Sequence, residues 1–348
     1  MDSTTPYDAI LLVSFGGPEK HDDVMPFLEN VTRGRSVPRE RLLEVAERYY
    51  RFDGVSPINA QNRALLAALR ALLDSQGPAL PLYWGNRNWR PLLTETVARM
   101  ADDGIRRALA FVTSAFASYS SCRQYLEDIA RARAEVGARA PVIDKLRLYW
   151  DHPGFIEPMV EHTEAALAML PDDARGEAHL AFTAHSVPRS TADTSAYVAQ
   201  LEEASGLVAA RLRGRHPWAL AFQSRSGPPA QPWLEPDIRD HLAALRARGV
   251  TEVVLVPLGF VSDHLEVQWD LDIEAAARAR ELGMRLTRAA TVGTHPGFVA
   301  MIRELVRERT GDAPRRALGR GGPAPDVCVP GCCLSPARPP MAPAAPRD

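Results

Sequence analysis

Lysine is nearly absent from this chain of 348 residues. Only Lys20 and Lys145 are present, so almost all of the 41 basic side chains are arginine. A phosphate-binding Walker A loop needs a lysine directly after a glycine, and neither lysine has that neighbour. Any anion site must therefore be built from the planar, forked guanidinium groups of arginine, which suit carboxylates.

Net charge is also nearly absent. The formal net charge is −2 at pH 7, which argues against a general nucleic-acid-binding protein. The sequence has no GxSxG or HExxH motif, so the corresponding hydrolase and zinc-protease chemistries are excluded. The glycine-rich run at 319–322 follows no predicted strand and is not a dinucleotide-binding fingerprint.

Long apolar runs are missing as well. No stretch approaches the roughly 20 apolar residues that span a bilayer. The first residues, "MDSTTPYDAILLVSFGGPE", carry acids where a signal peptide has basic residues. We therefore expect a cytoplasmic protein without a transmembrane segment.

Cysteine is scarce, with four residues in the chain. Cys122 stands alone, while Cys328, Cys332 and Cys333 crowd the C-terminal segment. In a cytoplasmic protein such a grouping favours metal binding over disulfide bonds.

What the sequence does contain is a regular alternation of strand-like apolar stretches with segments of helical periodicity. This alternation predicts βαβ units and parallel sheets. The pattern runs once before and once after about residue 150, so we expect two similar α/β domains, 1–150 and 151–310, with a cleft between them. A Pro/Gly-rich tail without a core of its own follows at 311–348. The predicted strands are 9–17, 80–86, 108–116, 145–150, 179–186, 218–224 and 252–260.

Titratable side chains gather at the ends of two predicted strands. His185 lies at the end of 179–186, and His264 and Glu266 follow 252–260. Ligands of open α/β sheets bind at the carboxyl ends of strands, where a histidine and a glutamate suit proton transfer or capture of a divalent metal. A structural role is the alternative, because a lone histidine is usually structural and Glu266 near a helix N-terminus favours the helix dipole.

Glu266, Asp270 and Glu274 follow one another at intervals of four residues. On a helix they share one face, where like charges repel. Steps of four residues drift about 40° on an α-helix, and one wide π-type turn would align the three carboxylates. Such a row is costly beside an apolar strand unless it handles protons or cations. Capping of a helix does not explain Asp270 and Glu274.

A basic segment, "NVTRGRSVPRERLLEVAERYYRFDGVSPIN", combines six arginines with Tyr49 and Tyr50. One interpretation is a solvated basic helix. The other is a site for several carboxylates attached to a flat apolar body, with arginine forks on the acids and aromatic faces on the plane.

Taken together, these motifs resemble the ferrochelatase family, and most of all its actinobacterial branch. The resemblance covers the chain from its beginning to about residue 310. It rests on "LLVSFGGPE" at 11–19, "GRSVP" at 34–38, "GVSP" at 54–57, "WGNRNWRP" at 84–91, "SYSSCRQY" at 118–125, "FTAHSVP" at 182–188, "FQSRSGPPAQPWLEPDI" at 222–238 and "PLGFVSDHLEVQWDLDIE" at 257–274.

The resemblance implies two Rossmann-like domains, each doubly wound around a parallel four-stranded sheet. It also implies insertion of Fe²⁺ into a porphyrin held between them, with coproporphyrin III expected to give coproheme in heme biosynthesis. The alternatives are a protoporphyrin IX ferrochelatase, a non-catalytic tetrapyrrole or heme carrier on the same fold, and a cobalt or nickel chelatase. Transient contact with neighbouring heme-pathway enzymes is a further expectation.

The resemblance also assigns roles to residues. His185 and Glu266 match the two active-site groups, Asp270 and Glu274 match a path for protons or metal, and His264 matches a neighbouring histidine. The residues expected near the porphyrin are Phe15, Arg33, Arg35, Arg48, Tyr49, Ser56, Ser118 and Tyr119. Phe15 departs from members that carry a tyrosine near the product iron, so no oxygen ligand comes from this position.

Many family members bind a [2Fe–2S] cluster with one cysteine in mid-chain and three near the C-terminus. Cys122, Cys328, Cys332 and Cys333 match that number, four thiolates for two irons. The spacing C-x₃-C-C departs from the animal pattern, and neighbouring side chains tend to diverge. A zinc site or free thiols are the alternatives.

Overall fold

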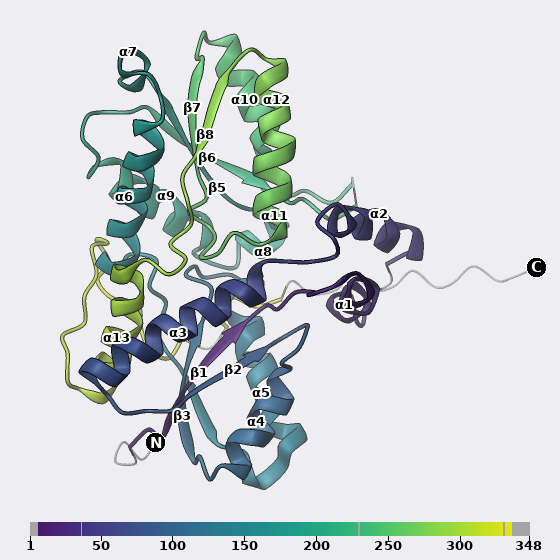
Figure 1. Cartoon of the computed structure of the whole chain (residues 1–348), viewed down its shortest axis with the longest axis vertical. Helices are drawn as coiled ribbons and strands as arrows, with labels where there is room; N and C mark the ends of the chain where they lie inside the picture. Colours follow the sequence, from purple (N-terminus) through teal and green to yellow (C-terminus); the bar gives the residue numbers. More distant parts are fainter. Residues whose placement is uncertain (1–5, 36, 229, 330, 336–348) are drawn as a thin grey trace, which may run out of the picture.

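The structure is a computed structural model that describes residues 6–35, 37–228, 230–329 and 331–335. Figure 1 shows two α/β units stacked along the long axis, each with its own sheet. The first sheet contains β1 (Ala9–Ser14), β2 (Leu82–Asn86), β3 (Arg107–Val112) and β4 (Val142–Lys145), all parallel, in the order β2-β1-β3-β4. The second contains β5 (His179–His185), β6 (Trp218–Gln223), β7 (Glu252–Val256) and β8 (Arg285–Arg288), again parallel, in the order β6-β5-β7-β8.

The two sheets therefore have the same topology, which confirms the expected pair of doubly wound four-stranded units. The central strands are buried on both faces, as parallel strands covered by helices are. In each sheet the second strand lies on one side of the first strand, and the third and fourth strands lie on the other. The strand order therefore reverses between β1 and β3 and between β5 and β7. Ligand sites of such folds lie at these switch points.

Most helices of the first half pack against its sheet, whereas α1 and α2 form a separate small layer beside it (Figure 1). The basic segment with its six arginines, between residues 33 and 51, contains α2, as the interpretation of a basic helix expects. The helices are α1 (Val24–Val31), α2 (Arg39–Tyr50), α3 (Ile58–Gln76), α4 (Leu93–Asp102) and α5 (Gln124–Val136), with the short turns η1 (His21–Asp23) and η3 (Gly137–Arg139) and a π turn, η2 (Tyr119–Arg123).

The second half adds a similar set of helices. These are α6 (Pro153–Ala168), α7 (Asp172–Arg175), α8 (Arg189–Ala192), α9 (Tyr197–Ala209), α10 (Ile238–Ala247), α11 (Leu265–Val267), the π helix η4 (Gln268–Ala275), α12 (Ala276–Glu281) and α13 (Pro296–Thr310). None of the helices in the described ranges is long and apolar enough to cross a membrane.

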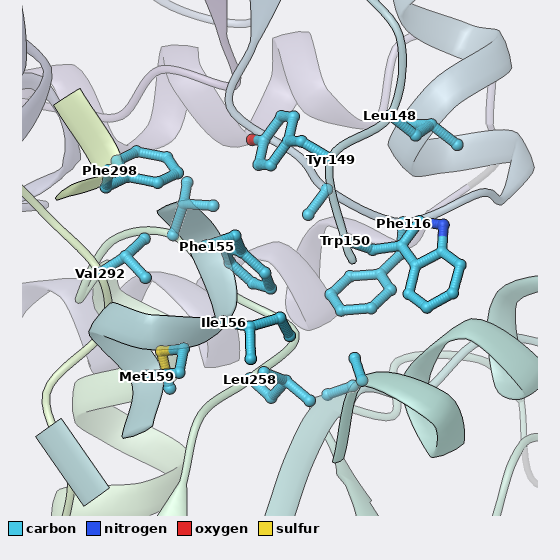
Figure 2. Close-up of a cluster of buried hydrophobic side chains, with 14 of the residues drawn as sticks. Phe116, Leu148, Tyr149, Trp150, Phe155, Ile156, Met159, Leu258, Val292 and Phe298 are labelled. Carbon is cyan, nitrogen blue, oxygen red and sulfur yellow. The ribbon is translucent and has the colours of Figure 1, made fainter. Parts of the chain in front are cut away.

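One core joins the two halves. Tyr149 stacks on Phe111, and Phe298 meets both rings edge to face. Phe155 meets Tyr149 edge to face, and the Tyr149 hydroxyl donates to the Val112 carbonyl. Aromatic residues from both halves therefore share one cluster, in which Figure 2 shows Tyr149, Phe155 and Phe298. Such aromatic pairs add about 0.5–1.5 kcal/mol each beyond the area they bury. The cluster holds the junction near residue 150 rigid.

The last helix also spans the halves. α13 packs on α6 and on α3, and Arg303 donates to the carbonyls of Gln76 and Gly77 at the end of α3. The close crossing with α6 needs glycine, because a Cβ on Gly154 would lie 2.7 Å from the Gly297 carbonyl oxygen. The domain boundaries 1–150, 151–310 and 311–348 themselves remain predictions.

One strand prediction was wrong, and one strand was missed. The stretch 145–150 is not a strand, since β4 covers Val142–Lys145 instead. Beyond it the chain leaves the sheet to bury Tyr149 and Trp150 and to pair Arg147 with Glu308. The edge strand β8 was missed because its sequence, "RLTR", is polar and only partly buried.

The tail forms no core of its own in its described part. Its described residues, 311–329 and 331–335, pack on both halves, where the Leu318 amide donates to the Asp151 carbonyl and Cys333 joins the shared core. This path carries Cys328, Cys332 and Cys333 back to Cys122. The last residues of the predicted tail, 336–348, lie outside the described residues.

Candidate active site

His185 and Glu266 meet at the switch point of the second sheet. His185 ends β5 and Glu266 lies in α11, reached by the loop that follows β7. The distance from His185 Nε2 to Glu266 Oε2 is 3.7 Å. The Nδ1–H of His185 donates to the Ser186 carbonyl, and the Tyr197 hydroxyl donates to the His185 carbonyl. These contacts fix the ring so that Nε2 faces the carboxylate.

The pair is electrostatically matched. Burial alone would lower the pKa of His185, but the charge and hydrogen bond of Glu266 raise it to about 9. Burial would raise the pKa of Glu266, but His185 lowers it to about 2. The side chains remain 34% and 47% exposed, so water still reaches the pair and weakens the attraction. At neutral pH the resting state is therefore an imidazolium beside a carboxylate.

The expected wide turn is present. η4 is a π helix over Gln268–Ala275, directly after α11, and carries Asp270 and Glu274. Arg48 on α2 reaches both acids, with Nη1 3.5 Å from Asp270 Oδ1 and Nη2 3.9 Å from Glu274 Oε1. Because one guanidinium contacts both carboxylates, Asp270 and Glu274 share a face of the π helix.

Asp270 is the buried member of the row. Its pKa is raised to about 6, chiefly by burial and also by Glu266, while a hydrogen bond from Ser224 opposes the rise. Ser224 adopts φ 62°, a left-handed conformation that is unusual outside glycine. Backbone strain of this kind clusters at functional sites. The sequence offered only a weak signal for Ser224, namely its position at the end of a predicted strand.

Glu274 has its own partners. The Trp269 indole N–H donates to Glu274 Oε1 at 2.7 Å, and Arg239 Nη1 lies 3.5 Å from Oε2. Arg48 and Arg51 also stack on the Trp269 ring, with their guanidinium carbons 5.5 and 5.0 Å from its centroid. This cation–π stack links α2 of the first half to the π helix of the second. No sequence pattern predicted it.

His264 caps α11 and does not join the pair directly. Its Nδ1 accepts from the Glu266 amide at 3.2 Å, and its ring meets Phe260 edge to face. Burial lowers its pKa, and the charge of Glu266 acts against this. An Nδ1 that accepts the Glu266 amide carries no proton, and the lowered pKa favours that arrangement.

Three more of the residues expected near the porphyrin lie in the first half, and Tyr49 is the one among them that the structure brings near Glu266. Tyr49 packs on Phe27, and both burial and the nearby Glu266 raise its pKa. Ser56 is buried against Gly17, where a Cβ would lie 2.7 Å from the serine Cβ. Phe15 lies in the same layer, with Phe27 at 6.2 Å and Arg87 over its ring.

The other expected contacts lie elsewhere. Arg33 and Arg35 are exposed at the end of α1. Ser118 caps the π turn η2 by accepting from the Ser121 amide, and the Tyr119 hydroxyl donates to Glu127. The structure thus places Ser118 and Tyr119 on the turn that carries Cys122. Their role at the porphyrin remains a prediction.

The four cysteines come together. Cys122 lies buried in η2, where burial and a hydrogen bond from its thiol to Cys328 raise its pKa, while the same contact lowers the pKa of Cys328. Cys328 also contacts Cys332, whose Sγ lies 3.4 Å from that of Cys333. Cys333 has φ 53°, a left-handed conformation that is unusual outside glycine.

The thiols form a string of pairwise contacts. Within the described ranges, no group of three or more His, Cys, Asp or Glu side chains is arranged to hold a single metal ion. Contact with Cys328 and burial raise the pKa of Cys122, and burial raises the pKa of Cys333, while nearby Lys145 acts against both. Four thiols from sequence-distant segments match the number of ligands that a two-iron cluster takes.

Comparison with known proteins decides the family. The family model for ferrochelatase matches residues 7–310. This chain is a ferrochelatase-family protein. It is 58% identical to a coproporphyrin III ferrochelatase of Frankia alni over 346 residues, covering 96% of this chain and 88% of the relative. It is 54% identical to the coproporphyrin III ferrochelatase of Streptomyces coelicolor, covering 99% and 97%, and 54% identical to a ferrochelatase of Rhodopirellula baltica, covering 98% of each chain.

Solved structures agree on the fold. SirB of Bacillus subtilis with Fe³⁺ aligns with a TM-score of 0.54 at 12% identity, covering 88% of this chain and 98% of SirB. CbiX, described as the terminal enzyme of siroheme biosynthesis in denitrifying bacteria, aligns with a TM-score of 0.51 at 15% identity, covering 86% and 98%. At such identities the likeness supports the fold alone.

Proposed function

We propose that this protein inserts Fe²⁺ into coproporphyrin III to give coproheme. The observation that carries the proposal is the His185–Glu266 pair, 3.7 Å apart at the switch point and followed by the acids of the π helix. The relatives named as coproporphyrin III ferrochelatases support the choice of substrate. Its cytoplasmic location and contacts with neighbouring heme-pathway enzymes remain predictions.

The reaction exchanges two pyrrole protons for one Fe²⁺, without a change of oxidation state. A flat porphyrin aims no lone pair at an approaching metal, so an enzyme that is complementary to a bent macrocycle lowers the barrier. A site with only a few oxygen and nitrogen ligands can release iron to the porphyrin, whereas a site that fills the whole coordination sphere would retain it. Glu266, with Asp270 and Glu274 behind it, fits delivery of the metal.

His185 fits removal of the pyrrole protons. Its raised pKa depends on the charge of Glu266, so the resting imidazolium cannot accept a proton. When Fe²⁺ neutralises Glu266, the pKa of His185 falls and the Nε2 proton passes to water, which reaches the half-exposed pair, so the ring becomes able to accept a pyrrole proton. Arrival of the metal and activation of the base are thereby coupled through the Nε2–Oε2 contact.

On the first half, arginine forks and polar side chains fit the propionates of the porphyrin. Arg48 contacts the acid row, Tyr49 lies near Glu266, and Ser56 is buried beside Gly17, while Arg33 and Arg35 add exposed positive charge after α1. Phe15 offers an apolar face without an oxygen ligand.

For the cysteines we propose a [2Fe–2S] cluster held by Cys122, Cys328, Cys332 and Cys333. The pairwise thiol contacts support it, and the group would supply one-electron redox chemistry and tie the tail to η2. The visible spectrum of anaerobically purified protein tests it. Red-brown absorption that Cys332→Ser abolishes is expected, whereas colourless protein that contains zinc or no metal would overturn it.

The activity itself is tested by incubating anaerobic protein with Fe²⁺ and either coproporphyrin III or protoporphyrin IX. We expect the Soret band of metalated coproporphyrin, with many turnovers per protein and a clear preference over protoporphyrin IX. Stoichiometric binding without turnover would instead identify a tetrapyrrole carrier. Faster insertion of Co²⁺ or Ni²⁺ in competition with Fe²⁺ would identify a different chelatase.

A further inference from the structure

Gln61 joins the two halves of the protein at the base of the active-site loop. It lies in the first turn of α3, and its side-chain amide makes two hydrogen bonds with the backbone of Asp263. Gln61 Oε1 accepts from the Asp263 amide at 2.9 Å, and Gln61 Nε2 donates to the Asp263 carbonyl at 3.2 Å. A two-point contact fixes both the distance and the orientation of the peptide it holds.

Asp263 begins the segment that carries the chemistry. His264, the residue after it, caps α11, and Glu266 follows three positions beyond Asp263. The Asp263 carboxylate accepts from Arg288 Nη1 at 3.0 Å, and the same guanidinium holds both oxygens of Asp272 in the π helix, at 2.5 and 3.1 Å. The loop and the π helix are thus braced into one unit, and Gln61 attaches this unit to the first half.

The other side of the attachment is the region expected to hold the porphyrin. Gln61 follows Ser56 by five residues, and Ser56 packs on Gly17, which lies just after β1 of the first sheet. A shift of the Asp263 loop relative to α3 would therefore move Glu266 relative to the macrocycle. An error of about 1 Å in such a placement can slow a reaction about 100-fold.

We propose that Gln61 is a positioning residue that sets the distance between Glu266 and the porphyrin. This inference rests on the proposed function. Gln61 acts through the Asp263 backbone and does not touch the reacting atoms. Removing its amide should slow metal insertion while leaving porphyrin binding intact, because the groups on the first half keep their places.

The chain offers a matched control at the other end of the same helix. Arg303 ties the end of α3 to α13 through the Gln76 and Gly77 carbonyls, both at 2.6 Å. Replacing Arg303 also removes two hydrogen bonds between the halves, but far along α3 from Asp263. A lower melting temperature should appear in the variants of both residues. Misplacement of Glu266 relative to the porphyrin, and hence slower metal insertion, should appear only in the Gln61 variants.

The test compares Gln61→Met, Gln61→Glu and Arg303→Met with wild-type protein. Methionine preserves length and volume without hydrogen bonds. Glutamate keeps the acceptor for the Asp263 amide but loses the donor. Gln61 and Asp263 line a cavity of about 480 Å³, so the new side chains have room. Steady-state metalation of coproporphyrin III, porphyrin binding by fluorescence quenching, and thermal unfolding are measured for each.

For Gln61→Met we expect kcat to fall about tenfold, with KM for porphyrin within about twofold of wild type. Gln61→Glu should lie between, and Arg303→Met should keep its kcat despite a similar loss of melting temperature. A kcat within twofold of wild type for Gln61→Met, or an equal loss in Arg303→Met, would overturn the inference. Inactive wild-type protein would instead contradict the proposed function, so the two failures are distinguishable.

Discussion

Arg48 of α2 lies against Asp270 of the π helix, with Nη1 3.5 Å from Oδ1. The same guanidinium reaches Glu274 and stacks on Trp269. An arginine expected at the porphyrin propionates is thus also a counter-charge to the acid row. A propionate that draws Arg48 away would leave the row more negative and more attractive to Fe²⁺.

Arg48→Ala should therefore affect the two substrates in opposite directions. KM for Fe²⁺ should fall roughly three- to tenfold because the row loses a counter-charge, and KM for porphyrin should rise about tenfold because a propionate loses its fork. Steady-state rates at varied Fe²⁺ and varied porphyrin measure both. Arg51→Ala, which shares the Trp269 ring, is the control and should leave KM for Fe²⁺ unchanged. A higher KM for Fe²⁺ in Arg48→Ala would refute this electrostatic account.

Buried histidines should make the protein less stable in mild acid. Burial and neighbouring His241 lower the pKa of His179 to about 4, against an ordinary value of 6.5, and its Nε2 has no hydrogen-bond partner among the described residues. Between these values the unfolded chain binds a proton that the folded chain does not. Stability is thus complete above pH 6.5 and declines as the pH falls toward 4, by at most about 3 kcal/mol from this residue.

Chemical denaturation of wild-type protein and His179→Gln between pH 4 and 7 measures this effect. The variant should show a flatter dependence of unfolding free energy on pH. Asp151 and Asp270, whose raised pKa values of about 6 act in the opposite direction, are present in both proteins and cancel in the comparison. Exposed His21→Gln serves as control, and equal slopes in all three proteins would contradict the prediction.

The ion pair between Arg147 and Glu308 should be one of the more costly contacts to break. Both side chains are nearly fully buried, and two hydrogen bonds of 2.7 and 2.8 Å join them across 161 residues. Glu308→Ala leaves an uncompensated guanidinium and should lower the unfolding free energy by about 3–5 kcal/mol. Urea titration measures it, with exposed Glu281→Ala as the matched control. A loss below about 1 kcal/mol would show that water or a rearrangement replaces the pair.

The parts of the fold and site that could be predicted from the sequence are those marked by periodic patterns. Apolar strands alternating with helices predicted both sheets, and acids at intervals of four predicted the π turn that η4 contains. Strand ends placed His185 and Glu266 together. The alternation and the acid row are local, because each depends on spacing along the chain, whereas the meeting of His185 and Glu266 follows from the rule that the carboxyl ends of parallel strands share one edge of the sheet.

Contacts between distant segments left no such pattern. Gln61 and Asp263 are separated by 202 residues, and nothing near either one marks the bridge. The pairing of Arg48 with Asp270 and the stack on Trp269 depend equally on how the halves meet. The polar strand β8 lacks the apolar signal of the buried strands, and 145–150 has that signal because it fills the junction between the halves.

Insertion of the metal by Glu266 and His185 together requires the negative charge of Glu266, which a single substitution removes. Glu266→Gln keeps the shape of the side chain but removes the charge that holds His185 protonated and attracts Fe²⁺. The initial rate of Soret-band formation with coproporphyrin III and Fe²⁺ should fall at least about 100-fold, while Glu281→Gln keeps the wild-type rate. A Glu266→Gln rate within twofold of wild type would contradict the account.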